Sequence, residues 1–113
     1  MHEMSLSLSL VDLVSGRAAA EGARRVLSVG VEVGALGHVE PQALAFCLES
    51  AARGTALDGA RFEISTPQGK AWCFTCATEV PLAHRAAPCP GCGGHELRLS
   101  QGEELRVTTM EID

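Results

Sequence analysis

The chain has 113 residues, the length of one ordinary domain, and a formal net charge of −5 with a single lysine, Lys70. This acidic balance disfavours a phosphate backbone as a partner, so no nucleic-acid binding is expected. The start has no basic region, and serines and an aspartate interrupt the apolar residues of SLSLSLVDLV, which argues against a signal peptide. No stretch is long and apolar enough to cross a bilayer, so the composition predicts a cytoplasmic protein without membrane association.

The first predicted element is a helix over residues 3–22. The repeat SLSLSL has period two and would also suit a strand. A helix accounts for more of the segment, because DLVSGRAAAEGARR continues it with good helix formers. The apolar residues expected on one face of this helix are Leu6, Leu10, Leu13 and Val14.

A β-strand is predicted next, in RVLSVGVEV, residues 25–33, because its apolar residues alternate along the segment. The side chains expected together on one side of this strand are Leu27, Val29, Val31 and Val33.

A second helix is predicted in EPQALAFCLESAARG, residues 40–54. Pro41 suits the first helical position and Gly54 suits the stop. The apolar face of this helix comprises Leu44, Cys47, Leu48 and Ala51. Cys47 is therefore predicted to be a small core residue without a chemical role.

A second strand is predicted in ARFEIST, residues 60–66, which alternates through a phenylalanine and an isoleucine. The last predicted strand is ELRVTTMEI, residues 104–112, which is rich in β-formers. The alternation of its apolar residues shifts by one position between Val107 and Met110, a phase slip that indicates a bulge or burial on both faces.

Between these two strands lie four of the five cysteines, in two C-x-x-C pairs. They are Cys73, Cys76, Cys89 and Cys92, with the spacing C-x2-C-x12-C-x2-C. In a cytosolic chain such pairs indicate metal binding or redox chemistry before disulfides. Two facing C-x-x-C turns supply four thiolates in a tetrahedron, which suits zinc. Four cysteines close the coordination shell, so a structural zinc site without hydrolytic activity is predicted.

Other interpretations of this segment stay open at the sequence level. A single C-x-x-C could be a redox pair, although no βαβ pattern surrounds either of these. CPGC is also similar to the knuckle of a rubredoxin-like iron site. His84 and His95 flank the cluster and either could replace a thiolate, but exposed loop positions are the favoured interpretation.

These elements predict an α+β fold, in which a small three-stranded sheet carries two helices and a zinc-ribbon module is inserted. The strand–helix–strand segment allows a parallel pair with a right-handed crossover, and the last strand completes the sheet. Residues 1–68 and 101–113 would form the α/β domain, and residues 69–100 the zinc-binding domain. The inserted module has little apolar material, so its folding free energy must come largely from the metal, at ~10–16 kcal/mol for structural zinc.

Several segments, taken in order, resemble the HypA/HybF family of nickel metallochaperones. They are MHEMSLSLSLVDLV, VEVGALGHVEP, GTALDGARFEI, the two C-x-x-C pairs and GEELRVTTMEI. The family helps to insert nickel during hydrogenase maturation and in some organisms also serves urease. The resemblance covers essentially the whole chain and implies a non-enzymatic carrier, with Ni(II) as transient cargo and Zn(II) as a structural ion. It also implies two partners, the GTPase accessory protein of hydrogenase maturation and the hydrogenase large subunit.

The resemblance also implies a nickel site at the start of the chain. The family's nickel ligand is the histidine of M-H-E, which is His2 here, and the adjacent glutamate, Glu3, is implicated with it. The four zinc cysteines match one for one. An acidic residue after the first strand has been linked to the family's nickel site, and Glu40 corresponds to it.

The chemistry of this terminus agrees with a nickel ligand set. A bulky second residue should preserve Met1, whose α-amine, with a typical pKa of ~7.7–8, is partly neutral in the cytoplasm. The amine of Met1 with the backbone nitrogen and imidazole Nδ1 of His2 would form a chelate of three nitrogens, which suits Ni(II). The Glu3 amide or carboxylate, water or Glu40 would fill the remaining positions. We expect such an incomplete site to exchange its ion readily, as a carrier requires.

Two other classes of function remain open. The chain could be a zinc-ribbon interaction module without a nickel role. An enzyme is disfavoured, because no Ser/His/Asp or Cys/His arrangement is present and the only cluster of reactive side chains is a closed thiolate shell.

Overall fold

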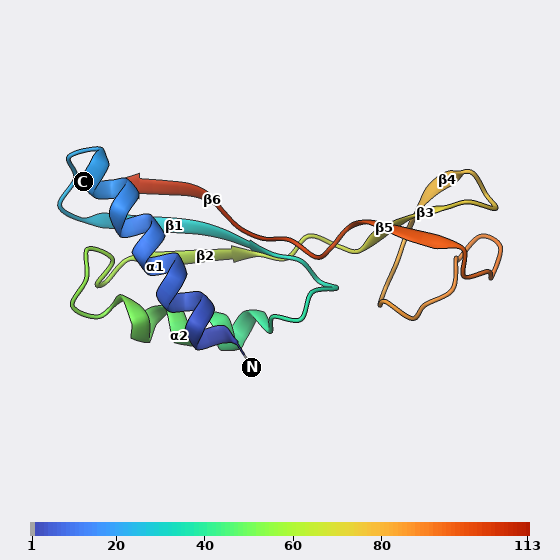
Figure 1. The fold of residues 1–113 in the computed structure, drawn as a ribbon, viewed down its shortest axis with the longest axis horizontal. Helices are drawn as coiled ribbons and strands as arrows, with labels where there is room; N and C mark the ends of the chain where they lie inside the picture. The colour runs from blue at the N-terminus through green and yellow to red at the C-terminus, as the bar shows by residue number, and fades with distance from the viewer. Residues whose placement is uncertain (1) are drawn as a thin grey trace. The chain divides into compact units, whose positions relative to one another are not determined.

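The structure is a computed structural model that describes residues 2–113, and the predicted nickel ligand Met1 lies outside the described residues. The elements in chain order are α1 (Glu3–Ala20), β1 (Val26–Val33), α2 (Pro41–Ala52), β2 (Arg61–Ser65), β3 (Lys70–Cys73), β4 (Thr78–Pro81), β5 (Leu97–Gln101) and β6 (Leu105–Ile112) (Figure 1). The two helices and three strands predicted from periodicity are all confirmed. In the described residues, no helix has the length and apolar character needed to span a bilayer.

The contacts within the chain divide it into two units, and each unit carries one three-stranded sheet. The first unit comprises the residues up to Glu32, Val39–Ser65 and Arg106–Asp113. The second unit comprises Val33–His38 and Thr66–Leu105. It contains the whole predicted zinc-binding range, 69–100, and extends beyond that range at both ends. That each unit is an independent domain stays a prediction.

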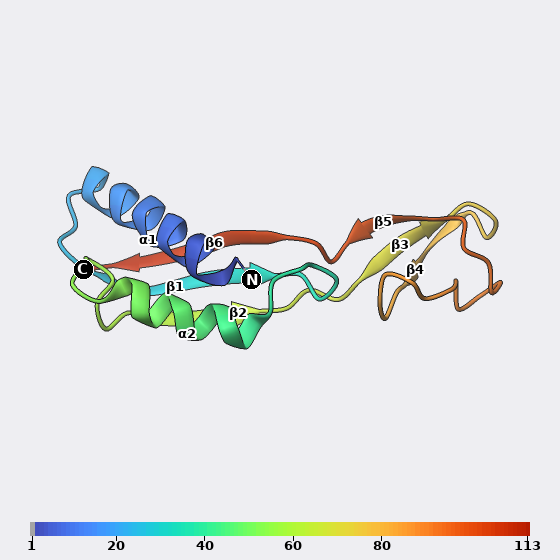
Figure 2. The same cartoon turned by 60° about the horizontal axis from the view of Figure 1, so that its bottom comes forward.

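The sheet of the first unit has the strand order β2-β1-β6. β1 and β2 are parallel, with Val29 opposite Phe62 and Val31 opposite Ile64, so the predicted parallel pair is confirmed. β6 runs antiparallel to β1, since the Asp113 N–H at the end of β6 donates to the Arg25 carbonyl just before β1. Both helices cover the same face of this sheet (Figures 1 and 2).

The core of the first unit lies between this sheet and the helices. Val29, Val31 and Val33 of β1 are fully buried, as predicted. The prediction for Leu27 is wrong, because its side chain is 41% exposed. The register with β2 begins only at Ser28, so Leu27 lies before the part of β1 that β2 flanks.

The buried stripe of α1 follows the helical repeat but is rotated from the predicted one. Its buried residues are Ser7, Leu10, Val11, Val14 and Ala18. Leu13, predicted to be in the core, is 66% exposed, because it lies about 100° around the helix axis from Val14. Its side chain lines a groove between α1 and β6 instead.

α2 starts and stops where the sequence predicts. Pro41 occupies its first turn, and Gly54 after its end has a φ of +76°, a left-handed conformation that favours glycine. Leu44 and Leu48 are fully buried. Cys47 is only half-buried, so the prediction that it belongs to the core is met in part.

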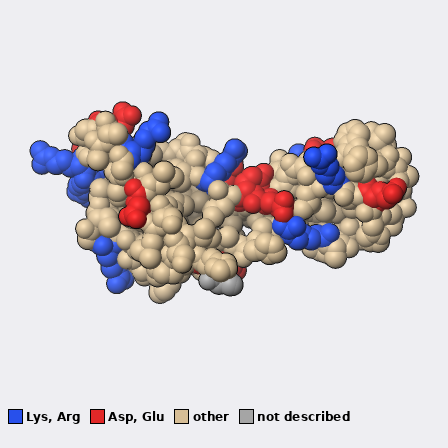
Figure 3. Space-filling view, in the orientation of Figure 1, with Lys and Arg blue, Asp and Glu red and all other residues tan. Residues whose placement is uncertain are grey.

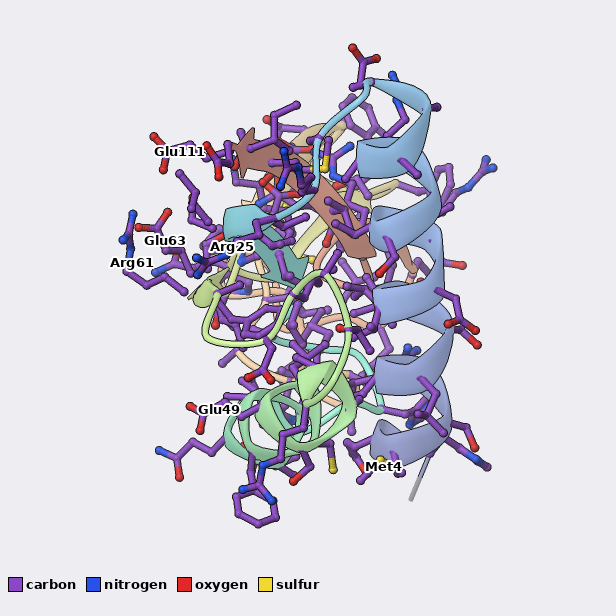
Figure 4. All side chains as sticks on the ribbon, turned by 90° about the vertical axis from the view of Figure 1, so that its left-hand side faces the viewer. Met4, Arg25, Glu49, Arg61, Glu63 and Glu111 are labelled. Atoms are coloured by element: carbon purple, nitrogen blue, oxygen red, sulfur yellow. The ribbon has the colours of Figure 1, made fainter. Side chains whose placement is uncertain are left out.

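The open face of the first sheet is polar. Arg61, Glu63 and Glu111 lie on the side of the sheet away from the helices (Figure 4). The Arg61 guanidinium lies 3.4 Å from the Glu63 carboxylate and 3.6 Å from that of Glu111. These side chains are largely exposed, so such ion pairs add little to stability and leave the helix-covered face as the main core.

The phase slip predicted in β6 is confirmed. Leu105, Val107, Met110 and Ile112 are half-buried, while Thr108 and Thr109 are both exposed. Gly30 of β1 lies against these threonines. A Cβ added at Gly30 would lie 2.5 and 2.8 Å from their hydroxyl oxygens, so a larger residue here would force the threonine side chains to shift.

We expect Leu48→Ala to lower the free energy of unfolding of the first unit by about 2–5 kcal/mol, because Leu48 is fully buried and the truncation leaves a cavity. Urea denaturation of the zinc-loaded protein measures this loss. Phe46→Ala on the same helix is the control, because Phe46 is 71% exposed and its truncation should change stability by less than about 0.5 kcal/mol. Equal losses for the two variants would show that α2 is oriented differently.

The second unit has a sheet with the order β4-β3-β5, in which both neighbours pair antiparallel with β3. The sequence did not predict these three strands. Their inner face covers a small core formed by Leu36, Ala71 and Leu82, with Ala87, Leu97 and Leu99 half-buried against it. The module therefore contains some apolar material of its own, on a smaller scale than the first unit.

Candidate metal centres

The four predicted zinc cysteines converge at one end of the second sheet. The Sγ atoms of Cys73 and Cys92 lie 3.7 Å apart, and those of Cys76 and Cys89 lie 3.9 Å apart. All four sulfurs lie within 4.8 Å of one another. A tetrahedral zinc ion with Zn–S bonds of about 2.3 Å places its sulfurs about 3.8 Å apart. The geometry of the thiols therefore fits a structural zinc ion.

Backbone N–H groups in both C-x-x-C turns are directed at the sulfurs. The Cys76 N–H donates to Cys73 Sγ at 3.4 Å, and the Gly91 N–H donates to Cys89 Sγ at 3.3 Å. Such bonds stabilise thiolates and orient them toward an ion. The first turn places Ala77 at a φ of +54°, a conformation that costs a residue with a Cβ about 1–2 kcal/mol.

The four thiols perturb one another strongly. Hydrogen bonds from the backbone N–H groups of Cys92 and Gly91 lower the pKa of Cys89 to about 7. Hydrogen bonding to the Cys73 side chain raises the pKa of Cys76 to about 12. Without a metal ion, the protein thus favours the thiolate form of Cys89 and disfavours that of Cys76. A divalent cation supplies the charge that lets all four thiols deprotonate.

Neither flanking histidine belongs to the cluster. His84 and His95 are both exposed, and the group of possible ligand atoms in the described part of the chain contains only the four cysteine sulfurs. The favoured interpretation of these histidines as exposed loop residues therefore agrees with the structure.

The predicted nickel ligand His2 lies immediately before α1. Its carbonyl oxygen accepts the N–H of Leu6 at 2.9 Å, which starts the helix. Its imidazole is exposed and makes no capping hydrogen bond. The helix thus fixes the backbone of His2 and leaves the side chain accessible to an ion from solution.

The structure brings Glu3 and Glu40 together, although 37 positions separate them in the chain. The Glu40 backbone N–H donates to Glu3 Oε2 at 3.2 Å, so the starts of α1 and α2 are adjacent. The chain's α-amino group and this backbone N–H lower the pKa of the Glu3 carboxyl to about 2. Glu3 therefore remains a carboxylate throughout the physiological range of pH.

The Glu40 side chain has a structural role that the sequence interpretation missed. Its carboxylate accepts hydrogen bonds from the N–H groups of Gln42 and Ala43 at 3.2 and 3.0 Å, so Glu40 is the N-cap of α2. The proline at position 41 signals a helix start and could have indicated this cap. As an accessory nickel ligand, Glu40 would have to share or release a capping hydrogen bond.

We expect Glu40→Ala to lower the free energy of unfolding by about 0.5–2 kcal/mol, because the substitution removes the N-cap of α2. Glu40→Asp is the control, because aspartate is a preferred N-cap and should preserve stability. Thermal unfolding and nickel titration of both variants separate the two roles. If Glu40→Ala unfolds like the wild type, the capping hydrogen bonds are energetically unimportant.

Comparisons with known proteins decide the family. The family model described as "Hydrogenase/urease nickel incorporation, metallochaperone, hypA" matches residues 1–112. The chain belongs to the HypA family. A hydrogenase maturation factor HypA of Rhodopseudomonas palustris strain BisB5 is 48% identical to it over 113 residues, which is the full length of both chains. That of Aeromonas hydrophila is 42% identical over 112 residues, or 99% of each chain.

The HypA fold is also seen in solved structures. The solution structure of the Ni metallochaperone HypA from Helicobacter pylori matches with a TM-score of 0.70 at 23% identity, covering 99% of this chain and 97% of that one. A second solution structure of a HypA protein matches with a TM-score of 0.73 at 23% identity. At this level of identity these matches show the fold alone.

Proposed function

We propose that this chain binds Ni(II) at its N-terminus and delivers it during the maturation of nickel–iron hydrogenase. The proposed ligands are the amine of Met1, the backbone nitrogen and imidazole of His2, and Glu3. Membership of the HypA family, together with the exposed imidazole of His2 and the position of Glu3 next to it in the sequence, carries this proposal. A structural zinc ion at Cys73, Cys76, Cys89 and Cys92 would hold the second unit folded.

The electrostatics of the terminus suit a site that releases its cargo. The positive ends of α1 and α2 lie side by side there, and a helix N-terminus disfavours a cation. The carboxylates of Glu3 and Glu40 oppose this effect. A few strong nitrogen ligands would thus hold nickel where the electrostatic potential of the helix N-termini disfavours a cation. Its open coordination positions would be available to ligands of the protein that receives the ion. Glu40 would be an accessory ligand at most, because it also caps α2.

The proposed partners are the GTPase accessory protein of hydrogenase maturation and the hydrogenase large subunit, in the cytoplasm. The relatives named hydrogenase maturation factor support the hydrogenase as the destination. Urease is a second candidate, because the description of the family names it. The family consists of maturation metallochaperones rather than catalytic enzymes, and no catalytic residues are proposed.

Metal analysis of the untagged protein, before and after the addition of nickel, tests this function. We expect about one zinc per chain and no visible colour on isolation, and about one additional nickel per chain with unchanged zinc after loading. An iron-type visible spectrum would contradict the zinc assignment. Failure to take up nickel beyond zinc would favour a zinc-ribbon interaction module.

A further inference from the structure

The last strand, β6, lies at an open edge of the first sheet. The strand order β2-β1-β6 leaves its outer side without a neighbouring strand in residues 2–113. The strand is eight residues long, and α1 runs obliquely to it rather than along it (Figure 1). Such an edge presents a row of unpaired N–H and C=O groups that can pair with another strand. The sequence of β6, LRVTTMEI, indicates which strand would fit.

Two hydrogen bonds show that the backbone of β6 contains one irregularity. The Gly34 N–H donates to the Glu104 carbonyl at 2.7 Å, just before β6 begins. The Asp113 N–H donates to the Arg25 carbonyl at 3.1 Å, just after β6 ends. Positions 104 and 113 therefore both point their backbone groups inward, toward the neighbouring segment. Strict alternation cannot direct an even and an odd position to the same side, so one extra residue lies between them.

The extra residue lies at Thr108 and Thr109. Both threonine hydroxyls lie beside Gly30 of β1, as in a bulge where two residues oppose one. Alternation from each end of the strand up to this bulge identifies the residues whose N–H and C=O groups point outward. They are the four half-buried apolar residues of the strand, Leu105, Val107, Met110 and Ile112.

The outward positions have the same spacing when β6 is followed in either direction. If two copies of β6 pair antiparallel about a two-fold axis at the bulge, Val107 lies opposite Met110 of the second copy. Leu105 then lies opposite Ile112 of the second copy. Every outward N–H and C=O group thus meets an outward group of the other strand, as an antiparallel ladder requires. A register shifted in either direction would leave some of these groups opposite inward ones.

We propose that the free edges of β6 from two copies of this chain pair in this register. Their three-stranded sheets would join into one sheet of six strands with two-fold symmetry. A regular strand of another protein would fall out of register at the bulge, whereas a second copy has the same extra residue in the same place. This selects a second copy as the occupant of the edge. The inference goes beyond nickel delivery and does not depend on it.

The charges on β6 are complementary in the same register. Arg106 would lie opposite Glu111 of the second copy, and the symmetry forms this pair twice. Within one chain Arg106 lies 2.6 Å from Glu32, and Glu111 lies 3.6 Å from Arg61. Arg106 and Glu111 are largely exposed, so each can contact a further partner. Opposite charges directly across two strands stabilise their pairing.

The surroundings of the edge also suit a second copy. A groove between α1 and β6 is lined by Leu13, Val107 and Met110, and Leu13 is 66% exposed. The proposed pairing would place the same apolar residues of the second copy next to Val107 and Met110. Basic and acidic side chains are interspersed on the first unit in Figure 3. The face seen there therefore presents no surface of a single charge sign that would repel another copy.

The test is sedimentation equilibrium of the zinc-loaded, nickel-free full chain under reducing conditions, from about 1 μM to about 1 mM. We expect a reversible monomer–dimer equilibrium. Arg106→Glu and Glu111→Arg should each weaken dimerisation about tenfold or more, because each places like charges opposite one another in two symmetric pairs. An equimolar mixture of these two variants should recover dimers, because opposite charges again face each other in the mixed pair. A variant that had lost its fold would not be rescued by mixing.

A control variant and a second measurement locate the interface. Arg53→Glu reverses an exposed charge just after α2, away from β6, and should dimerise as the wild type does. Amide hydrogen exchange of Val107 and Met110, whose N–H groups point outward, should slow as the chain concentration rises. The proposal is overturned if these amides stay unprotected in a dimer, or if mixing the two charge variants restores no dimer. A chain that remains monomeric at about 1 mM would also overturn it and leave the edge to a strand of another protein.

Discussion

Cys89→Ser is expected to abolish zinc binding and to unfold the second unit. Cys89 is buried, and its Sγ lies 3.9 Å from that of Cys76, so its loss removes one of four ligands from the centre of the cluster. Structural zinc contributes about 10–16 kcal/mol to folding, far more than the few buried side chains of this unit can replace. The first unit has its own sheet and helices and should remain folded. Zinc analysis together with a ¹H–¹⁵N NMR spectrum measures both effects in one sample.

Cys47→Ser is the matched control, because it removes the fifth cysteine without touching the cluster. It should retain about one zinc per chain and an unchanged spectrum for the second unit. Chelation of zinc from the wild type should reproduce the spectrum of Cys89→Ser. If Cys89→Ser keeps its zinc and well-dispersed signals from Thr66–Leu105, zinc is not what holds this unit together. If both units unfold together, the first unit does not fold independently of the metal.

The sequence was sufficient for the elements whose burial is periodic. α1 and α2 were predicted because each buries one stripe, and β1 because it buries alternate valines. The errors arose at the margins of those faces. Leu13 and Leu27 are apolar, but Leu13 lies beside the stripe of its helix and Leu27 precedes the part of its strand that β2 flanks. Hydrophobicity marks residues suited to the core, and the positions of neighbouring elements decide which of them are covered.

The strands of the second unit escaped prediction for a different reason. β3 and β4 are four residues each, too short for alternation to stand out, and β3 buries a metal-binding cysteine where a larger apolar residue would mark a strand. Spacing alone located the zinc cysteines, since two C-x-x-C pairs supply four thiolates in the tetrahedral arrangement that suits zinc. The contact between Glu3 and the Glu40 backbone could not be read from the sequence, because it depends on how two helix starts come together in the folded chain.

His2→Ala is expected to abolish specific nickel binding while the zinc content and fold stay unchanged. The imidazole of His2 is exposed and makes no capping hydrogen bond, so its loss should not disturb α1. Isothermal titration with Ni(II) measures the effect directly. His95→Ala is the matched control, because it removes another exposed imidazole, which is not among the ligand atoms of the zinc cluster. Normal nickel binding by His2→Ala would contradict the assignment of nickel to this terminus and favour a zinc-ribbon interaction module.

An extension of the chain before Met1 tests the other nitrogen of the chelate. It converts the α-amine into an amide and removes the first chelate ring, so nickel binding should fall nearly as far as in His2→Ala.

Acid should also release nickel, because protons compete with the metal for the imidazole and the amine. The Glu3 carboxyl does not contribute to this acid release. Since its pKa is lowered to about 2, any stability it adds is fully present above about pH 4.5 and is lost only as the pH falls through about 2. Loss of nickel between pH 7 and 5 would therefore report the nitrogen ligands. If the extended chain binds nickel as tightly as the wild type at both pH values, the amine is not a ligand, and the three-nitrogen chelate is wrong even where His2 is required.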